Sequence, residues 1–363
     1  MLSNNNDTTL SKTITFLRLP LIVAVVFIHT QLDDVMINGT ALVHEGQFPV
    51  YGLLNHVVTN EFARIAVPLF FFISGFLFFY RSGFSLGIYG QKLKKRVRTL
   101  LVPYIFWNVV VLLLILLSQL FLSSMLSGRN KLVVDYDWLD WLDLFWSFRD
   151  GMPVCYQFWF IRDLMVVVLF SPILHPLIKY GKVFGVLALG VLWLFNVWFE
   201  VPGFSITAFF FFAFGAWFSM NRRDFTVDFR PMRWSATLIY LAWVVLDTCL
   251  WEYKLVDFDY VHKAGIVVGL VAVVSWTAYG ITKGRLRVSA FLAGSSFFVY
   301  AYHGMPVALV VKYWVRCLFP MSEWTMIAGY LLIPFFIVGV GVCLYALLHK
   351  YLPALTALVT GGR

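Results

Sequence analysis

Long apolar segments alternate with short polar connections along almost the whole chain, and ten of these segments are about 17 residues or longer. An α-helix needs about that length to cross the hydrocarbon core of a bilayer. The pattern predicts an all-α fold, a polytopic membrane bundle of about ten transmembrane helices. A polar segment (1–13) and a short tail (350–363) flank this membrane domain (14–349). The expected spans are residues 14–31, 62–80, 100–122, 158–178, 183–199, 204–220, 234–251, 264–281, 288–311 and 326–348.

The composition agrees with this class of protein. Hydrophobic residues make up 61% of the chain and charged residues only 13%. A soluble domain of 363 residues is excluded by so few charges. Because residues 1–13 are polar and no small-residue cleavage site follows the first apolar segment, we expect no cleavable signal peptide.

The distribution of charge predicts how the bundle is oriented. If the N-terminus is cytoplasmic, 19 of the 28 Lys and Arg residues fall on the inner side and 9 on the outer side, whereas 16 of the 19 acidic residues fall outside. Because positive charge is enriched in cytoplasmic loops, both termini are predicted to be cytoplasmic. The net charge of +9 belongs to this inner rim, so it does not indicate nucleic-acid binding.

Arg18 and His29 occupy the two ends of the first apolar segment. Eleven residues turn an α-helix by about three turns plus roughly 20°, so both side chains leave one face, and the rise between them is about 16 Å. Ionisable residues inside a membrane helix are costly and usually functional. The alternative is that Arg18 extends to the headgroups while His29 makes a buried hydrogen bond.

A second basic feature precedes the third span. Five cations, Lys92, Lys94, Lys95, Arg96 and Arg98, lie within seven residues. Such a density of positive charge can bind anionic headgroups or a phosphorylated ligand that enters from the cytoplasm. It can equally serve only as a topology signal.

Polar side chains are also expected in the outer half of the bundle. Lipid exposure would be costly for these groups, so we expect them to converge on a water-accessible cavity that opens outward, with some forming structural ion pairs. Glu61 and Arg64 are one helical turn apart and are predicted to pair. The other members are Trp159, Arg162, Asp163, Asp247 and His303.

Residues 125–157 form the longest connection, on the outer side. Within it Trp138, Trp141, Leu142 and Phe145 follow the spacing i, i+3, i+4, i+7. This pattern predicts an amphipathic helix at the membrane interface. It would serve as an anchor or as a lid over an acceptor groove.

Several common chemistries have no motif here. The chain contains no Walker-A loop, dinucleotide glycine pattern, HExxH, CxxC or GxSxG motif. Its four cysteines are scattered over different segments and suggest neither a metal site nor a disulfide framework. No metal is therefore predicted.

The arginine and histidine of the first span, together with four further motifs in the same order, resemble the acyltransferase-3 family of integral membrane acyltransferases. The resemblance extends from about residue 16 to 348 and is closest to the branch of surface polysaccharide and enterobacterial common antigen O-acetyltransferases. Thr99 stands where that family often carries the second arginine of an Arg-x-x-Arg pair, and Lys95 and Arg98 keep the spacing in a shifted register. The motifs are ARIAVPLFFFISGFL (63–77), KKRVRTLLVPYIFWN (94–108), FWFIRDLMVVVLFSPI (158–173) and YAYHGMPV (300–307).

The resemblance implies acyl transfer from cytoplasmic acyl-CoA, most often acetyl-CoA, to a hydroxyl of an outward-facing or lipid-linked glycan, in the inner membrane of a bacterium. His29 would act as a general base or as an acyl carrier, with Arg18 beside it. Donor binding would involve Arg18, Lys95, Arg96, Arg98 and Ser74. Acceptor binding would involve Glu61, Arg64, Trp159, Arg162, Asp163 and His303.

Two other functions are compatible with the same pattern. A transporter or flippase of lipid-linked saccharides would use a polar cavity without acyl transfer, but no inverted repeat is visible and a carrier does not need the spacing of Arg18 and His29. An acyltransferase that modifies lipid or peptidoglycan by the same mechanism is the third interpretation.

Overall fold

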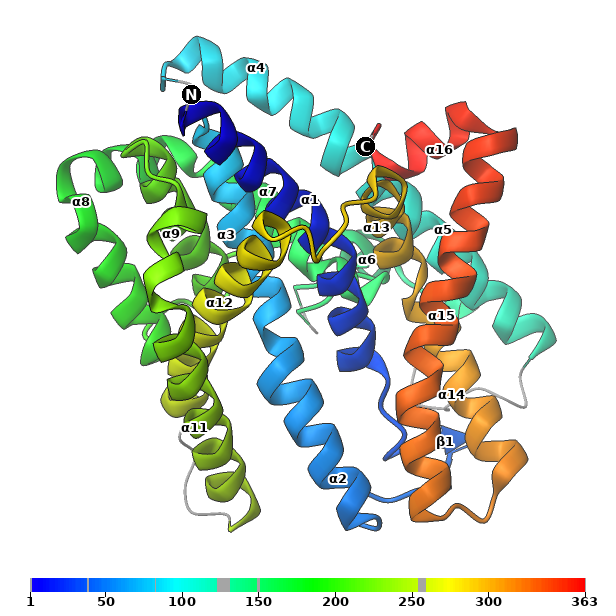
Figure 1. The fold of residues 1–363 in the computed structure, drawn as a ribbon. Helices are drawn as coiled ribbons and strands as arrows, with labels where there is room; N and C mark the ends of the chain where they lie inside the picture. Colours follow the sequence, from blue (N-terminus) through cyan, green and yellow to red (C-terminus); the bar gives the residue numbers. More distant parts are fainter. Residues whose placement is uncertain are drawn as a thin grey trace.

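The computed structural model describes residues 2–37, 39–81, 83–122, 131–148, 151–253 and 259–362, and these are almost entirely helical (Figure 1). The predicted all-α membrane bundle is confirmed. The described strands are the two-residue β1 (Met36–Ile37) and β2 (Thr40–Ala41), which pair antiparallel with Met36 opposite Ala41. This hairpin follows α1 (Leu2–His29).

Seven helical runs within the described residues are long and apolar enough to cross a membrane, and a bent pair gives an eighth. A further apolar helix, α9 (Ile206–Met220), is shorter. These numbers are compatible with the predicted count of about ten. The seven runs are Thr8–His29, Pro49–Phe79, Leu86–Phe121, Ser171–Leu194, Phe225–Glu252, Asp259–Thr282 and Glu323–Tyr351.

The first half of the bundle contains the second and third of these runs. The second run joins α2 (Pro49–Asn55), the π-helical η1 (His56–Phe62), the 3-10 turn η2 (Ala63–Ile65) and α3 (Ala66–Phe79). The third run joins α4 (Leu86–Arg96), the π-helical η3 (Val97–Leu101) and α5 (Val102–Phe121). The basic segment thus continues the helix of the third span rather than forming a separate loop.

The remaining helices follow in chain order. After η5 (Val133–Asp135) come α6 (Trp138–Trp146), η6 (Tyr156–Phe158), α7 (Trp159–Leu169), α8 (Ser171–Leu194) and α9. The last part contains α10 (Phe225–Asp228), η7 (Arg230–Met232), α11 (Arg233–Glu252), α12 (Asp259–Thr282), α13 (Ala290–Tyr302), α14 (Gly304–Leu318), α15 (Glu323–Tyr351) and α16 (Pro353–Thr360).

Two predicted spans are broken in the structure. The span expected at 158–178 divides between α7 and α8 at Phe170, just before Pro172, and α8 continues to Leu194 through a kink at Lys182 (φ 50°, ψ −131°). The span expected at 288–311 bends by 66° between α13 and α14, around His303. Pro306 accounts for this second break, because it has no N–H for the helical hydrogen bond to residue 302 and its ring crowds that carbonyl.

Helix α1 lies inside the bundle and packs against α3, α12, α13 and α15 (Figure 1). Beside it, α3 and α9 approach each other backbone to backbone at Gly75 and Gly215. A Cβ atom on Gly75 would overlap the carbonyl of Phe212, and one on Gly215 would overlap the carbonyl of Phe72. Small residues at a crossing permit such close packing in membrane helices, and the pair fixes α3 next to α9.

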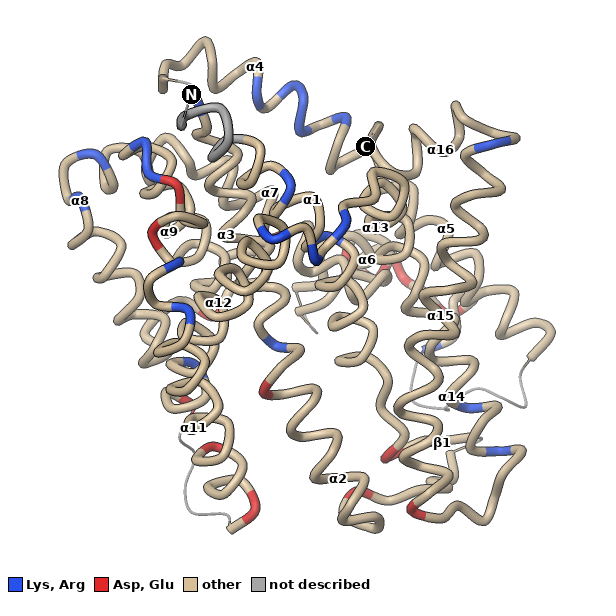
Figure 2. Tube along the Cα trace, in the orientation of Figure 1, with Lys and Arg blue, Asp and Glu red and all other residues tan. Residues whose placement is uncertain are grey.

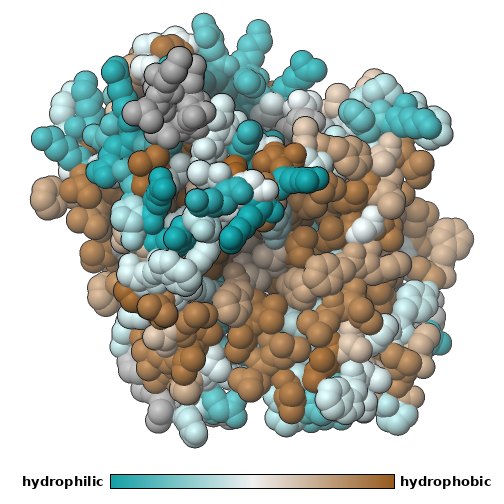
Figure 3. Space-filling view, in the orientation of Figure 1, coloured by the Kyte–Doolittle hydropathy of each residue, from teal (hydrophilic) through white to brown (hydrophobic). Residues whose placement is uncertain are grey.

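Both termini lie at the same end of the bundle, and most Lys and Arg residues gather there (Figure 2). The space-filling view shows the same end as hydrophilic and the face below it as broadly apolar (Figure 3). At the other end of the bundle, acidic residues are prominent (Figure 2). This polarity accords with the positive-inside pattern, and the cytoplasmic location of both termini stays a prediction.

The amphipathic helix expected within 125–157 is α6. Its N-cap is a capping box, in which the side chains of Asp137 and Asp140 each accept a hydrogen bond from the other's backbone N–H. Trp138 and Leu142 are 70% and 65% exposed, so an apolar face has no cover within the described residues. The Tyr104 hydroxyl donates to the carbonyl of Phe145 and ties α6 to α5.

Candidate active site

Helix α1 places Arg18 and His29 in two cavities that adjoin each other. Arg18 lines an inner cavity of about 190 Å³, and His29 lines an outer cavity of about 720 Å³. Val25, which lies between them on α1, lines both. The single helix face predicted from the spacing of eleven residues therefore borders both cavities.

The inner cavity collects polar groups from three helices around Arg18. Ser74 of α3 and Arg96 of α4 line it together with Arg18, and all three side chains are half-buried. Aromatic side chains such as Phe70 and Phe297 form much of the remaining wall. Two guanidinium groups in an otherwise apolar cavity form a site suited to an anionic group on an extended ligand.

The other basic residues of α4 and η3 do not face this cavity. Lys94, Lys95 and Arg98 are exposed, and Lys92 donates to the carbonyl of Phe78 at the end of α3. Of the residues predicted to bind the donor, the structure brings together Arg18, Arg96 and Ser74. It leaves Lys95 and Arg98 on the surface of the basic end.

Four side chains separate the two cavities and line both of them: Val25 of α1, Val67 of α3, Phe160 of α7 and Tyr300 of α13. We refer to these four residues as the waist. Three of them are apolar, and the Tyr300 hydroxyl is occupied because it donates to the backbone carbonyl of Gln157. The waist is therefore a poor path for ions and for charged groups.

A second imidazole lies next to His29 on the outer side of the waist. The rings of His29 and His303 have centroids 5.3 Å apart, and Tyr156 packs edge-on against His29 at 5.0 Å. His303 is fully buried, and its Nδ1 lies 2.6 Å from the carbonyl of Tyr300. Because a carbonyl only accepts, Nδ1 carries hydrogen, and Nε2 is left with no hydrogen-bond partner among the described residues.

Of the six predicted acceptor residues, two line the outer cavity and four do not. Arg64 and Trp159 are part of its wall, along with Trp193 and Trp251. Polar groups from α9, α11 and α12 complete the wall, including Thr207, Asp247, Asp259 and Lys263. Aromatic faces alternating with hydrogen-bonding groups suit a ligand that has both apolar faces and many hydroxyls.

Arg162 and Asp163 are buried and line neither cavity. They instead connect α7 to the end of α6. They form an ion pair with an N–O distance of 3.0 Å. Arg162 Nη1 also donates to the carbonyls of Trp146 (2.6 Å) and Gly151 (2.9 Å). These bonds join the start of α7 to the end of α6, so the pair stabilises the packing of these two helices.

The predicted pair between Glu61 and Arg64 is absent among the ion pairs described. Glu61 Oε1 instead lies 3.7 Å from Nε2 of His56 and 3.5 Å from Nδ1 of His262. The spacing of one α-helical turn suggested the pair, but residues 56–62 are π-helical and 63–65 form a 3-10 turn, so the side-chain directions differ from those of an α-helix. Arg64 is left exposed to the outer cavity.

Sequence reasoning missed His56 and His262. Both lie in apolar helical runs that are long enough to cross a membrane, and an ionisable residue in such a run is a candidate for function by that position alone. His56 lay outside the predicted second span, which began at residue 62, and His262 lay two residues before the predicted eighth span. The signal was lost because both spans begin earlier than the hydrophobic pattern indicated.

Comparison with known proteins gives two matches. Residues 12–348 match the model of a family described as an acyltransferase domain. The chain is also 25% identical over 374 aligned residues to the succinoglycan biosynthesis protein ExoH of Rhizobium meliloti (strain 1021), covering 98% of this chain and 94% of that protein. No solved structure matches the chain significantly.

Proposed function

The chain belongs to the acyltransferase-3 family, and on this premise we propose that it is an O-acyltransferase of the bacterial inner membrane. It moves an acyl group, by default acetyl, from cytoplasmic acyl-CoA to a hydroxyl of an extracytoplasmic or lipid-linked glycan. The observation that carries this proposal is the pair of adjoining cavities, with Arg18 in one and His29 in the other. The family membership itself supports a multi-pass membrane acyltransferase.

The inner cavity fits the donor. An acyl-CoA has phosphates at one end and a thioester at the end of a long, thin arm, so it needs cations near the cytoplasm and a narrow passage beyond them. Arg18 and Arg96 supply the cations at the basic end of the bundle. Arg18 and His29 are about 16 Å apart along α1. A donor whose phosphates lie at Arg18 would therefore extend its thioester toward the waist.

The transfer step needs one base at the outer side of the waist. His29 accepts the proton of the acceptor hydroxyl as the oxygen attacks the thioester carbonyl carbon. The carbon–oxygen bond forms, the carbon–sulfur bond breaks, and the CoA thiolate leaves through the inner cavity and takes up a proton. In this proposal His303 orients His29, a role supported by the two rings lying 5.3 Å apart.

The outer cavity fits a saccharide acceptor. Its indole rings provide flat apolar faces, and its acids, amides and hydroxyls provide partners for sugar hydroxyls. The similarity to a succinoglycan biosynthesis protein supports a polysaccharide or its lipid-linked precursor as the acceptor.

Two measurements test the proposal. Purified protein or membranes should release CoA thiol from acetyl-CoA in the presence of a glycan extract, and mass spectrometry of surface glycans should show one acyl group that is missing in cells without the protein. The His29→Ala variant, inserted in the membrane at normal levels, is the negative control. Movement of lipid-linked saccharide without any CoA release would instead support a transporter.

A further inference from the structure

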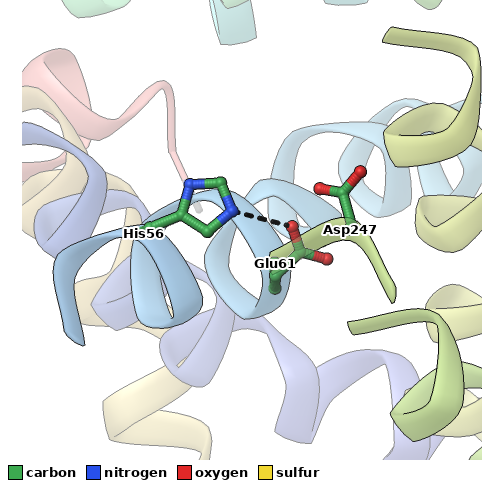
Figure 4. Close-up of side chains that lie close together, drawn as sticks. All are labelled: His56, Glu61 and Asp247. Carbon is green, nitrogen blue, oxygen red and sulfur yellow. Dashed lines mark ion pairs between the residues drawn. The ribbon is translucent and has the colours of Figure 1, made fainter. Parts of the chain in front are cut away.

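A compact group of four titratable side chains lies beside the outer cavity, apart from His29 and His303, and His56, Asp247 and His262 line the cavity wall. His56 and Glu61 come from η1, Asp247 from α11 and His262 from α12. Figure 4 shows the ring of His56 facing the carboxylate of Glu61, with the carboxylate of Asp247 on the far side of Glu61. His262 Nδ1 lies 3.5 Å from Glu61 Oε1 and 3.4 Å from Asp247 Oδ2.

The group is deeply buried and incompletely satisfied. His56, Glu61 and Asp247 are only 7%, 3% and 8% exposed. His56 Nε2 and Glu61 Oε1 have no hydrogen-bond partner among the described residues, although both point into the group. Two buried carboxylates repel each other and lose hydration, so they need positive charge nearby. Protonation of both His262 and His56 would be needed to supply two positive charges, whereas one divalent cation supplies both.

The spacing of the donor atoms matches a small divalent cation. One donor atom each from His56, Glu61 and Asp247 lies within 4.8 Å of the other two. Around tetrahedral Zn²⁺, with bonds of about 2.0–2.2 Å, neighbouring ligand atoms lie roughly 3.4 Å apart. The contact of 3.7 Å between His56 and Glu61 is already close to this value, and small side-chain rotations would bring in Asp247.

The surroundings of His56 hold its ring in a ligating position. The ring stacks on Trp251, with centroids 4.2 Å apart and planes 14° from parallel. The side-chain amide of Asn60 lies 3.2 Å from Nδ1, the ring nitrogen that does not face Glu61. Since the two ends of an amide have the same shape, its oxygen can accept from Nδ1–H, which leaves the lone pair of Nε2 for a metal.

We propose that His56, Glu61 and Asp247 bind one Zn²⁺ ion, with His262 as an outer hydrogen-bond partner of both carboxylates. Three protein ligands leave a fourth coordination position for water or a hydroxyl of a bound ligand, and two of the ligands, His56 and Asp247, line the outer cavity. The ion neutralises both carboxylates and joins η1 to α11. This binding requires neither acyl donor nor acceptor.

The test is metal binding by the full-length protein in detergent, purified without a histidine tag and stripped with EDTA. We expect one Zn²⁺ per chain by mass spectrometry of metal content after incubation and desalting. Competition with a zinc-responsive fluorophore gives the affinity. We expect Glu61→Gln and His56→Ala to weaken binding by more than the roughly 10–100-fold typical for loss of an outer-shell residue.

Asp259→Asn is the matched control, because Asp259 lines the same cavity but pairs with Lys263 and Asn196 instead. It should bind Zn²⁺ as the unmodified protein does. Zn²⁺ should also raise the Tm of the unmodified protein and leave that of Glu61→Gln unchanged. Glu61→Gln keeps the shape of the side chain, and gel filtration establishes that it is folded.

Either of two results would overturn the proposal. One is an unmodified protein that retains no stoichiometric Zn²⁺ and shows no rise in Tm. The other is folded Glu61→Gln and His56→Ala that bind Zn²⁺ as tightly as Asp259→Asn does. In both cases the four residues would be a proton-sharing network, while the acyltransferase assay with acetyl-CoA would be unaffected by the outcome.

Discussion

Arg96→Ala should weaken binding of the acyl donor far more than the same change at its basic neighbours. Arg96 lines the inner cavity with Arg18, whereas Lys95 and Arg98 are exposed at the basic end. A hydrogen bond to a charged group contributes about 1.5–3 kcal/mol, which corresponds to a rise in KM of roughly 10- to 150-fold. An exposed cation contributes about 0–1 kcal/mol, or at most about fivefold.

Initial rates of CoA thiol release, measured over a range of acetyl-CoA at fixed acceptor, give KM and kcat separately. Because a contact to the donor's phosphate is the same before and during the reaction, KM should rise and kcat should change little. The effects of Lys95→Ala and Arg98→Ala should also shrink as salt is raised, since exposed charges are screened. Arg96→Lys is the conservative comparison, and it should fall between Arg96→Ala and the unmodified protein.

The assignment of the inner cavity to the donor would be refuted if Lys95→Ala and Arg98→Ala raised KM as much as Arg96→Ala. It would also be refuted if Arg96→Ala left direct CoA binding unchanged in detergent. In that case the exposed basic surface would hold the donor, and the cavity next to Arg18 would have another ligand.

Three further predictions concern catalysis and packing. His29→Ala should lower kcat by about 10²–10⁴-fold with normal membrane insertion, and His303→Ala should lower it less, as measured by CoA release; near-normal turnover by His29→Ala would remove it from the chemistry. Gly215→Ala should lower the Tm measured by thermal unfolding in detergent, because its Cβ would overlap the carbonyl of Phe72 and overpacking costs about 1–3 kcal/mol. Arg162→Ala should cost about 3–5 kcal/mol of stability by leaving its buried partner unpaired, and a variant with full stability and altered acceptor KM would instead place this residue in the acceptor site.

The class of fold and the common face of Arg18 and His29 could be predicted from the sequence because both are local properties. Hydrophobic length alone indicates a membrane helix, and the spacing of Arg18 and His29 fixes their common face once α1 is a helix. The structure adds that this face borders both cavities. Arg96 was a candidate from the density of basic residues, whereas Ser74 came from the family resemblance, and both line the inner cavity.

The broken helices could not be predicted from hydrophobicity. An apolar segment looks the same whether it is straight or bent, so the break at His303 and the division at Phe170 were hidden within predicted spans. The π-helical stretch of residues 56–62 had a similar effect, because it turns Glu61 away from Arg64 and toward His56. Such irregularities are frequent at functional sites. Here the π-helical stretch borders the outer cavity, and the break at His303 lies next to His29.

The group around Glu61 was invisible in the sequence for a different reason. Its members come from three helical segments that are far apart in the chain, so no short motif contains them. His56 and Glu61 share η1, but a spacing of five residues would put them about 140° apart on an α-helix, so it does not read as a metal-ligand motif. The search for motifs found none, and only the packing of η1 against α11 and α12 places His56, Glu61 and Asp247 together.

The waist explains how α1 can border two cavities of different chemical character. Under the proposed function, the donor's phosphates lie at Arg18 and the acceptor hydroxyl lies at His29. A polar connection between the two cavities would then open a path for ions across the bilayer. Val25 lies between these residues on α1 and meets Val67, Phe160 and Tyr300 from three other helices. An apolar constriction admits a thin thioester arm but disfavours ions and phosphates.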